Sequence, residues 1–176
     1  SGNVATATQL VTITVLGDIP TITAPPAVIV EATGPLTTVS LGTPTVSDAV
    51  DPHPTVTNNA PSGGFPIGNS TVIWTATNLA HNSQSASQSV TVKDTTPPTI
   101  IAPPVTAEAT NPNGATVTYT VSATDLVDGT DAVTCSPPSG TSFGIGSTPV
   151  QCSAHDVAGN VRTVSFSVIV KDTTPP

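Results

Sequence analysis

Apolar and polar side chains alternate along short stretches of this chain, and no stretch carries a helical period over a useful length. Residues 70–77 show this most clearly, because Val72, Trp74 and Ala76 fall on one face of a strand while the threonines and Ile73 fall on the other. Runs rich in Val, Ile and Thr, separated by clusters of Gly, Pro, Asn and Asp, indicate short strands joined by turns. The pattern predicts an all-β sandwich with about seven strands in each repeating unit.

A repeated hexapeptide divides the chain into modules. Lys-Asp-Thr-Thr-Pro-Pro occupies residues 93–98 and again 171–176, which is a period of 78 residues. Each copy follows an alternating run, 90–92 in one case and 166–170 in the other, so a strand is expected to end there. Two prolines fix φ and remove two backbone donors, which predicts a stiff, extended linker between modules.

The period predicts four parts of the chain. We expect residues 1–16 to be the last strand of a preceding module, 17–94 and 95–172 to be two β-sandwich modules, and 173–176 to begin the linker to a next module. Between the two modules the offset is 77 residues around the acidic loops, which aligns Asp48 with Asp125 and Asp51 with Asp128. It returns to 78 from Phe65 and Phe143 onward.

Charge excludes two classes of partner. Only 8% of residues are charged, the net charge is −8, and the basic residues are Lys93, Arg162 and Lys171. Binding to nucleic acid or to an anionic membrane surface needs a cationic face, so neither is expected. No run approaches the roughly 18 apolar residues of a membrane-spanning helix, so any anchor is expected outside this segment.

Cys135 and Cys152 are the only cysteines, and both fall on predicted strands of the second module. Their separation of 17 positions does not fit a C-x-x-C metal or redox motif. We predict a disulfide, which indicates an oxidising compartment. In the first module Trp74 stands at the position of Cys152, so bulky hydrophobic packing is expected to fill the same space.

The second module resembles the hyalin repeat (HYR) family of immunoglobulin-like extracellular modules. The residues that carry the likeness are 123–125, 133–140, 143–146, 150–152 and the loop Asp156-Val157-Ala158-Gly159-Asn160. The first module departs from the pattern, since it lacks both cysteines and has Asn78-Leu79-Ala80-His81-Asn82 in that loop. The resemblance implies β-sandwiches in tandem arrays on secreted or surface proteins, usually linked with adhesion, and it does not imply an enzyme.

Acidic residues near the module ends form a candidate calcium site. Calcium takes six to eight oxygen ligands, so an acidic loop that meets an acidic linker can hold an ion and rigidify the joint. The alternative is that these side chains close turns through hydrogen bonds to the backbone. The spacing does not match an EF-hand loop, and no other cofactor is expected. The candidates are Glu31, Asp48, Asp51, Asp94, Glu108, Asp125, Asp128, Asp131 and Asp172.

Other polar motifs carry weaker signals. His53, His81 and His155 do not recur between modules, so solvated histidines are expected rather than a shared metal site. No Gly-x-Ser-x-Gly elbow accompanies them, and we predict that the chain is not an enzyme. The sequence Asn69-Ser70-Thr71 is a candidate N-glycosylation site.

Two functions remain open on the sequence alone. The first is a structural segment of an extracellular or cell-surface protein that forms a stalk or filament, with neighbouring modules or further copies of the chain as partners. The alternative is a binding module that recognises carbohydrate or protein through loops at one end of the sandwich, in which case Trp74 would be exposed. Within the first reading, residues 4–15 could instead donate a strand to a neighbouring molecule, or the modules could be passive spacers.

Overall fold

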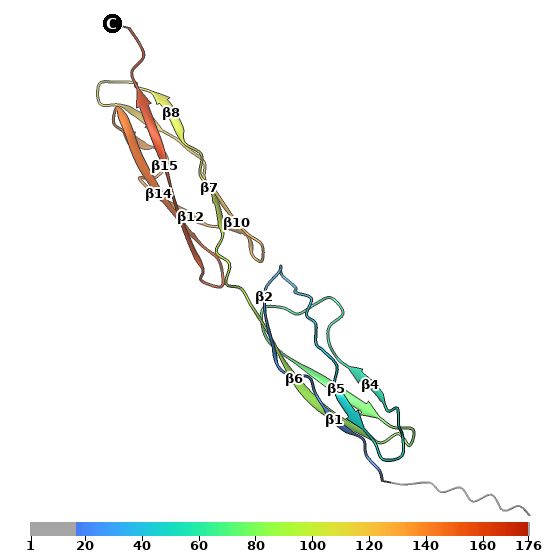
Figure 1. Ribbon diagram of the computed structural model, residues 1–176. Coiled ribbons are helices and arrows are strands. Elements are labelled where there is room, and N and C mark those ends of the chain that lie inside the picture. The colour runs from blue at the N-terminus through green and yellow to red at the C-terminus, as the bar shows by residue number, and fades with distance from the viewer. Residues whose placement is uncertain (1–16, 176) are drawn as a thin grey trace, which may run out of the picture. The chain divides into compact units, whose positions relative to one another are not determined.

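The computed structural model describes residues 17–175, in which fifteen strands and no helix are assigned (Figure 1). The strand expected within residues 1–16, and with it the hypothesis of strand donation, lies outside the described residues. Over the described part of the chain there is accordingly no helix long and apolar enough to cross a membrane. The chain forms two compact units.

The first module contains six strands rather than about seven. A four-stranded sheet has the order β2-β6-β5-β4, and β1 pairs with β3 in a separate antiparallel ribbon. An isolated bridge joins Thr37 to Phe65. The bounds are β1 Thr21–Thr23, β2 Val28–Glu31, β3 Thr45–Ser47, β4 Thr55–Asn58, β5 Gly68–Thr77 and β6 Ser83–Lys93.

The second module contains nine strands. Its largest sheet has the order β12-β14-β15-β8, with β8 parallel to β15, and two smaller sheets have the orders β11-β10-β7 and β13-β9. The acidic segment around Asp128, which we expected to be a loop, is an antiparallel hairpin of β10 and β11. The bounds are β7 Thr99–Ile101, β8 Val105–Glu108, β9 Ala115–Val117, β10 Ser122–Asp125, β11 Gly129–Asp131, β12 Val133–Ser136, β13 Thr141–Phe143, β14 Gly146–His155 and β15 Val161–Lys171.

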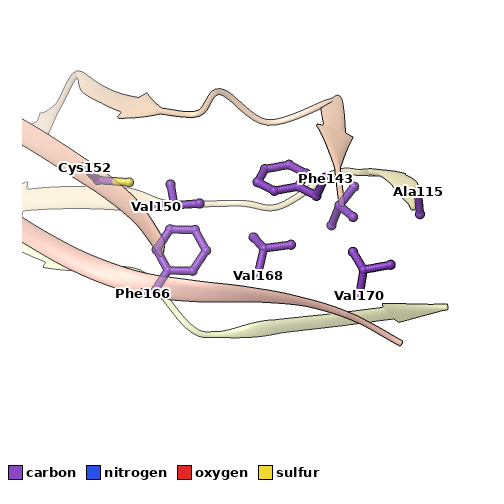
Figure 2. Close-up of a cluster of buried hydrophobic side chains, with 8 residues drawn as sticks. Ala115, Phe143, Val150, Cys152, Phe166, Val168 and Val170 are labelled. Atoms are coloured by element: carbon purple, nitrogen blue, oxygen red, sulfur yellow. The ribbon is translucent and has the colours of Figure 1, made fainter. Parts of the chain in front are cut away.

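The core of the second module follows the alternation of its two long strands. Alternate residues are buried from Val150 to Ala154 in β14 and from Phe166 to Val170 in β15. Figure 2 shows most of these side chains gathered with Phe143 of β13 and Ala115 of β9. Tyr119 adds an edge-to-face contact with Phe166 at a centroid distance of 5.0 Å. Burial of this apolar surface is the main stabilising term for so small a unit. The all-β prediction is confirmed.

The predicted disulfide is present. Cys135 of β12 lies directly opposite Cys152 of β14, and their sulfur atoms are 2.02 Å apart. The bond therefore joins neighbouring strands of one sheet, and it borders the core through the fully buried Cys152. In the first module the same register position is held by Asn58 and Trp74.

A polar side chain supports Trp74 in the core of the first module. The indole Nε1 donates a hydrogen bond to Gln88 Oε1 at 3.0 Å, and Gln88 is only 1% exposed. The amide of Gln88 in turn donates to the carbonyl oxygens of Pro26 and Leu41, both at 2.8 Å. The structure thus gives the first module a buried hydrogen-bonded cluster at the positions where the second has Cys152 and Phe166. Trp74 has the packing role that we predicted.

Replacing Gln88 by leucine is expected to lower the free energy of unfolding of the first module by about 2 kcal/mol, because it leaves the buried Trp74 N–H and two carbonyl oxygens without hydrogen-bond partners. Guanidinium unfolding followed by the fluorescence of Trp74, the single tryptophan of the chain, measures the change. Gln84→Leu, at the exposed start of the same strand, is the control and should shift stability by less than about 0.5 kcal/mol. Equal midpoints for both variants would show that the cluster does not stabilise the module.

Candidate metal centre

Three carboxylates from distant parts of the sequence meet at one end of the second module. Asp94 directly follows β6, Asp125 is the last residue of β10, and Asp156 directly follows β14. One oxygen from each lies within 4.8 Å of the others. The three residues are 8%, 9% and 3% exposed, in that order. All three belong to the same compact unit, so their proximity is a property of that unit.

Local turns hold two of the carboxylates in place. Asp125 Oδ1 accepts the N–H of Val127 at 2.7 Å, and Asp156 Oδ1 accepts the N–H of Asn160 at 2.7 Å. The side-chain amide of Asn160 donates both to Asp156 Oδ2 at 2.8 Å and to the carbonyl oxygen of Asp94 at 3.2 Å. The turn-closing role that we weighed against metal binding therefore exists, but it leaves other carboxylate oxygens for a further partner.

Asp94 contributes the oxygen that is least satisfied. Its Oδ1 accepts the N–H of Thr96 at 3.1 Å, whereas its Oδ2 is buried without a hydrogen-bond partner. Burial raises the pKa of the Asp94 carboxyl, and the negative charges of Asp125 and Asp156 raise it further. Asp131 also has a buried Oδ2 without a partner, and its pKa is raised by burial and then by neighbouring carboxylates. The region thus holds more negative charge than its own hydrogen bonds compensate.

The pKa of Asp156 moves in the opposite direction. Burial raises it, but hydrogen bonds from the side chain and the backbone of Asn160 and from the backbone of Gly159 and Ala158 together outweigh burial and lower it overall. Asp156 therefore favours the ionised form. An ionised Asp156 beside a buried Asp94 is an arrangement that attracts a cation or a proton.

The first module has the same loop with a different side chain. Asn78 occupies the position of Asp156, and its Oδ1 accepts the N–H of Asn82 at 3.0 Å as Asp156 does from Asn160. The Asn78 amide donates to Asp48 Oδ2 at 2.9 Å and to the carbonyl oxygen of Asp18 at 3.0 Å. Donation from the Asp51 backbone and then from Asn78 lowers the pKa of Asp48 to about 2. In the first module, an amide therefore donates to the carboxylate of Asp48. In the second module, the equivalent Asp125 faces the carboxylate of Asp156 instead.

The remaining predicted acidic residues have other partners. Glu31 accepts from the N–H and the hydroxyl of Thr95 at 2.7 and 2.8 Å, and Glu108 makes the same pair of bonds to Thr173 at 2.6 and 2.8 Å. These bonds, the backbone one first, lower the pKa of both glutamates. Backbone N–H groups also donate to Asp51, Asp128 and Asp172. None of these five belongs to the cluster of three carboxylates.

Sequence reasoning selected Asp94 and Asp125 but missed Asp156 as a candidate ligand. The available signal was the change from Asn78 to Asp156 within otherwise equivalent loops. His53, His81 and His155 are all exposed, and none is part of the cluster. Asn69 is exposed near the start of β5, and its glycosylation remains a prediction.

Comparison with solved structures returns tandem β-domain proteins at low identity. Five cadherin domains of protocadherin gamma B2 align at 11% identity and a TM-score of 0.39, covering 89% of this chain and 40% of that chain. Two domains of human protocadherin-24 align at 13% and 0.38, covering 88% and 99%. The titin I-band fragment I67–I69 aligns at 15% and 0.36, covering 89% and 67%. The chain therefore spans less than half of the protocadherin gamma B2 fragment.

A comparison with family models gives a match for the second module. No curated protein matches the sequence. The HYR domain model matches residues 93–170, which contain all three carboxylates of the cluster and the disulfide. The resemblance seen in the sequence motifs is confirmed for this segment, which matches the HYR domain model.

Proposed function

We propose that the chain is a structural segment of a secreted or cell-surface protein in which tandem modules build a stalk or filament. One observation carries the proposal: both modules hold the start of the following linker in the same way. The N–H of Ala32 donates to the carbonyl of Lys93 at 2.6 Å, and the N–H of Ala109 donates to the carbonyl of Lys171 at 2.7 Å. The repeated contact favours an array in which every linker is attached to the preceding module in the same way.

The glutamates complete this repeated contact. Besides their bonds to Thr95 and Thr173, Glu31 Oε1 accepts the Thr96 hydroxyl at 3.1 Å and Glu108 Oε1 accepts the Thr174 hydroxyl at 3.4 Å. The hexapeptide therefore leaves each module with its two threonines hydrogen-bonded to that module, just before the two prolines. The start of each linker is therefore held by hydrogen bonds, and its two prolines have a fixed φ. Such a linker suits an extended, stiff segment.

The competing function, a binding module that uses exposed aromatic side chains, receives less support. Trp74 is 7% exposed and Phe166 is 8% exposed, and Phe65 and Phe143 are more deeply buried still. Aromatic anchors of binding sites usually offer contact area to a partner, which these four side chains do not. A catalytic role is likewise not part of the proposal, since the exposed histidines lie outside the cluster of carboxylates.

Electron microscopy of material sheared from the producing cells tests the proposal. We expect fibres that contain this sequence by peptide mass, with a subunit spacing set by one or two modules, and we expect them to be absent from cells in which the coding sequence is deleted. Single flexible threads, or unchanged fibres on the deletion cells, would contradict the filament and favour a spacer that displays another domain.

A further inference from the structure

The cluster of Asp94, Asp125 and Asp156 lacks a positive partner. Three carboxylates with oxygens within 4.8 Å of one another are each at least nine-tenths buried, and Asp94 Oδ2 has no hydrogen-bond donor. A buried carboxylate without a partner is costly, and like charges at this distance add to the cost. The cluster therefore favours a cation or a proton as its partner.

The first module shows what the same fold does without a third carboxylate. There the Asn78 amide supplies two donors, one to Asp48 and one to the Asp18 carbonyl. In the second module the carboxylate of Asp156 removes both donors and adds a negative charge, although the loop keeps its other hydrogen bonds. Because the two loops share the same backbone hydrogen bonds, the difference concerns what partners Asp48 in the first module and Asp125 in the second. The Asn78 amide donates to Asp48, and an external ion can partner Asp125 together with Asp94 and Asp156.

We propose that Asp94, Asp125 and Asp156 bind one calcium ion, and that the first module, with Asn78, has no equivalent site. All candidate ligands are oxygens, which are the ligands of hard cations. Magnesium requires near-ideal octahedral geometry and retains its water, whereas calcium accepts irregular sets of carboxylates, carbonyls and water. The ion would connect the residue that follows β6 to the ends of β10 and β14. This inference rests on the cluster alone and does not depend on the proposed filament.

Equilibrium dialysis and thermal unfolding of the whole chain test the site. After removal of metal with EGTA, addition of calcium chloride should give one bound ion per chain, with a dissociation constant on the order of 10⁻⁴–10⁻³ M as in extracellular modules. The melting temperature of the second module should rise with calcium, because the ion binds the folded state only. Hydrogen exchange of peptides from residues 95–175 identifies that module, and Trp74 fluorescence follows the other.

Two reciprocal substitutions provide matched controls. Asp156→Asn gives the second module the amide of the first, so it should abolish calcium binding and the calcium-dependent rise, while the EGTA-treated variant melts no lower than the EGTA-treated parent. Asn78→Asp should have the opposite effect, since Asp18 Oδ2 is also buried without a partner. That variant should melt lower in EGTA and bind two calcium ions per chain.

Three results would overturn the inference. The first is calcium binding that persists in Asp156→Asn, which would place the ion elsewhere. The second is an equal response to magnesium chloride, which would remove the preference for calcium. The third is no response to calcium at neutral pH together with a gain in stability on mild acidification, which would show that the carboxylates share a proton instead.

Discussion

Replacing Gly114 by alanine is expected to lower the free energy of unfolding of the second module by about 3 kcal/mol or more. Gly114 has φ +118°, and a Cβ built there would lie 1.9 Å from the carbonyl oxygen of Phe143. The backbone conformation alone costs an L residue roughly 1–2 kcal/mol. Relief of the clash must displace backbone, because the carbon of Phe143 and the Cα of Gly144 are also only 2.9 Å away. Displacing β13 would loosen Phe143, which is 2% exposed in the core.

Gly140→Ala is the matched control for this effect. Gly140 also has positive φ, +83°, but a Cβ there would meet nothing within 4 Å. It should cost only the conformational strain, about 1–2 kcal/mol. Guanidinium unfolding, monitored by hydrogen exchange of peptides from residues 95–175, measures the stability of the second module in both variants. The unfolding of the first module, monitored by Trp74 fluorescence, should be unchanged in each. Equal destabilisation by the two substitutions would show that the backbone near Gly114 yields without loss of packing.

Alternation predicted the long strands well because it reports one buried face. Val72, Trp74 and Ala76 in β5 are 1%, 7% and 0% exposed, as a period of two requires. The same rule places Gln88 on the inward face with Val90 and Val92, although a polar side chain gives no sign of burial in the sequence. Only the structure shows that three hydrogen bonds satisfy this side chain.

The second module has more strands than predicted, because residues that favour turns form part of two of its strands. The segment 125–131 contains three aspartates and a glycine, which are depleted in strands and favoured in turns. It forms the hairpin of β10 and β11 because Asp125 pairs with Gly129 across a short turn. Backbone pairing with a neighbouring strand overrode the local preference. The predicted turn-closing role of Asp125 survives within that hairpin.

Only two of the three carboxylates of the acidic cluster were predicted, for a topological reason. Its members lie 31 residues apart twice, at 94, 125 and 156, and no local motif joins them. They meet because strand ends and the linker residue converge at one end of the module, which depends on sheet order rather than on spacing. The comparison of Asn78 with Asp156 was the one sequence signal that could have identified the third carboxylate, since it marks a charge change within a shared loop.

Replacing both Cys135 and Cys152 by alanine is expected to lower the free energy of unfolding of the second module by about 3 kcal/mol. The bond closes a loop between residues 17 positions apart, so its loss frees the unfolded chain more than the folded one. The module should nevertheless fold, because the first module holds Asn58 opposite Trp74 at the same register and needs no cross-link there.

Reduction of the unsubstituted chain separates the cross-link from the packing of the sulfur atoms. Dithiothreitol breaks the bond but leaves both side chains, so it should reproduce most of the loss seen in the double alanine variant. Cys152 is fully buried, so any excess loss in the variant reports the cavity left in the core beside Val150 and Phe166. Trp74 fluorescence provides the internal reference, since the first module contains no cysteine. An unchanged second module after reduction would mean that core packing, rather than the covalent bond, holds β12 against β14.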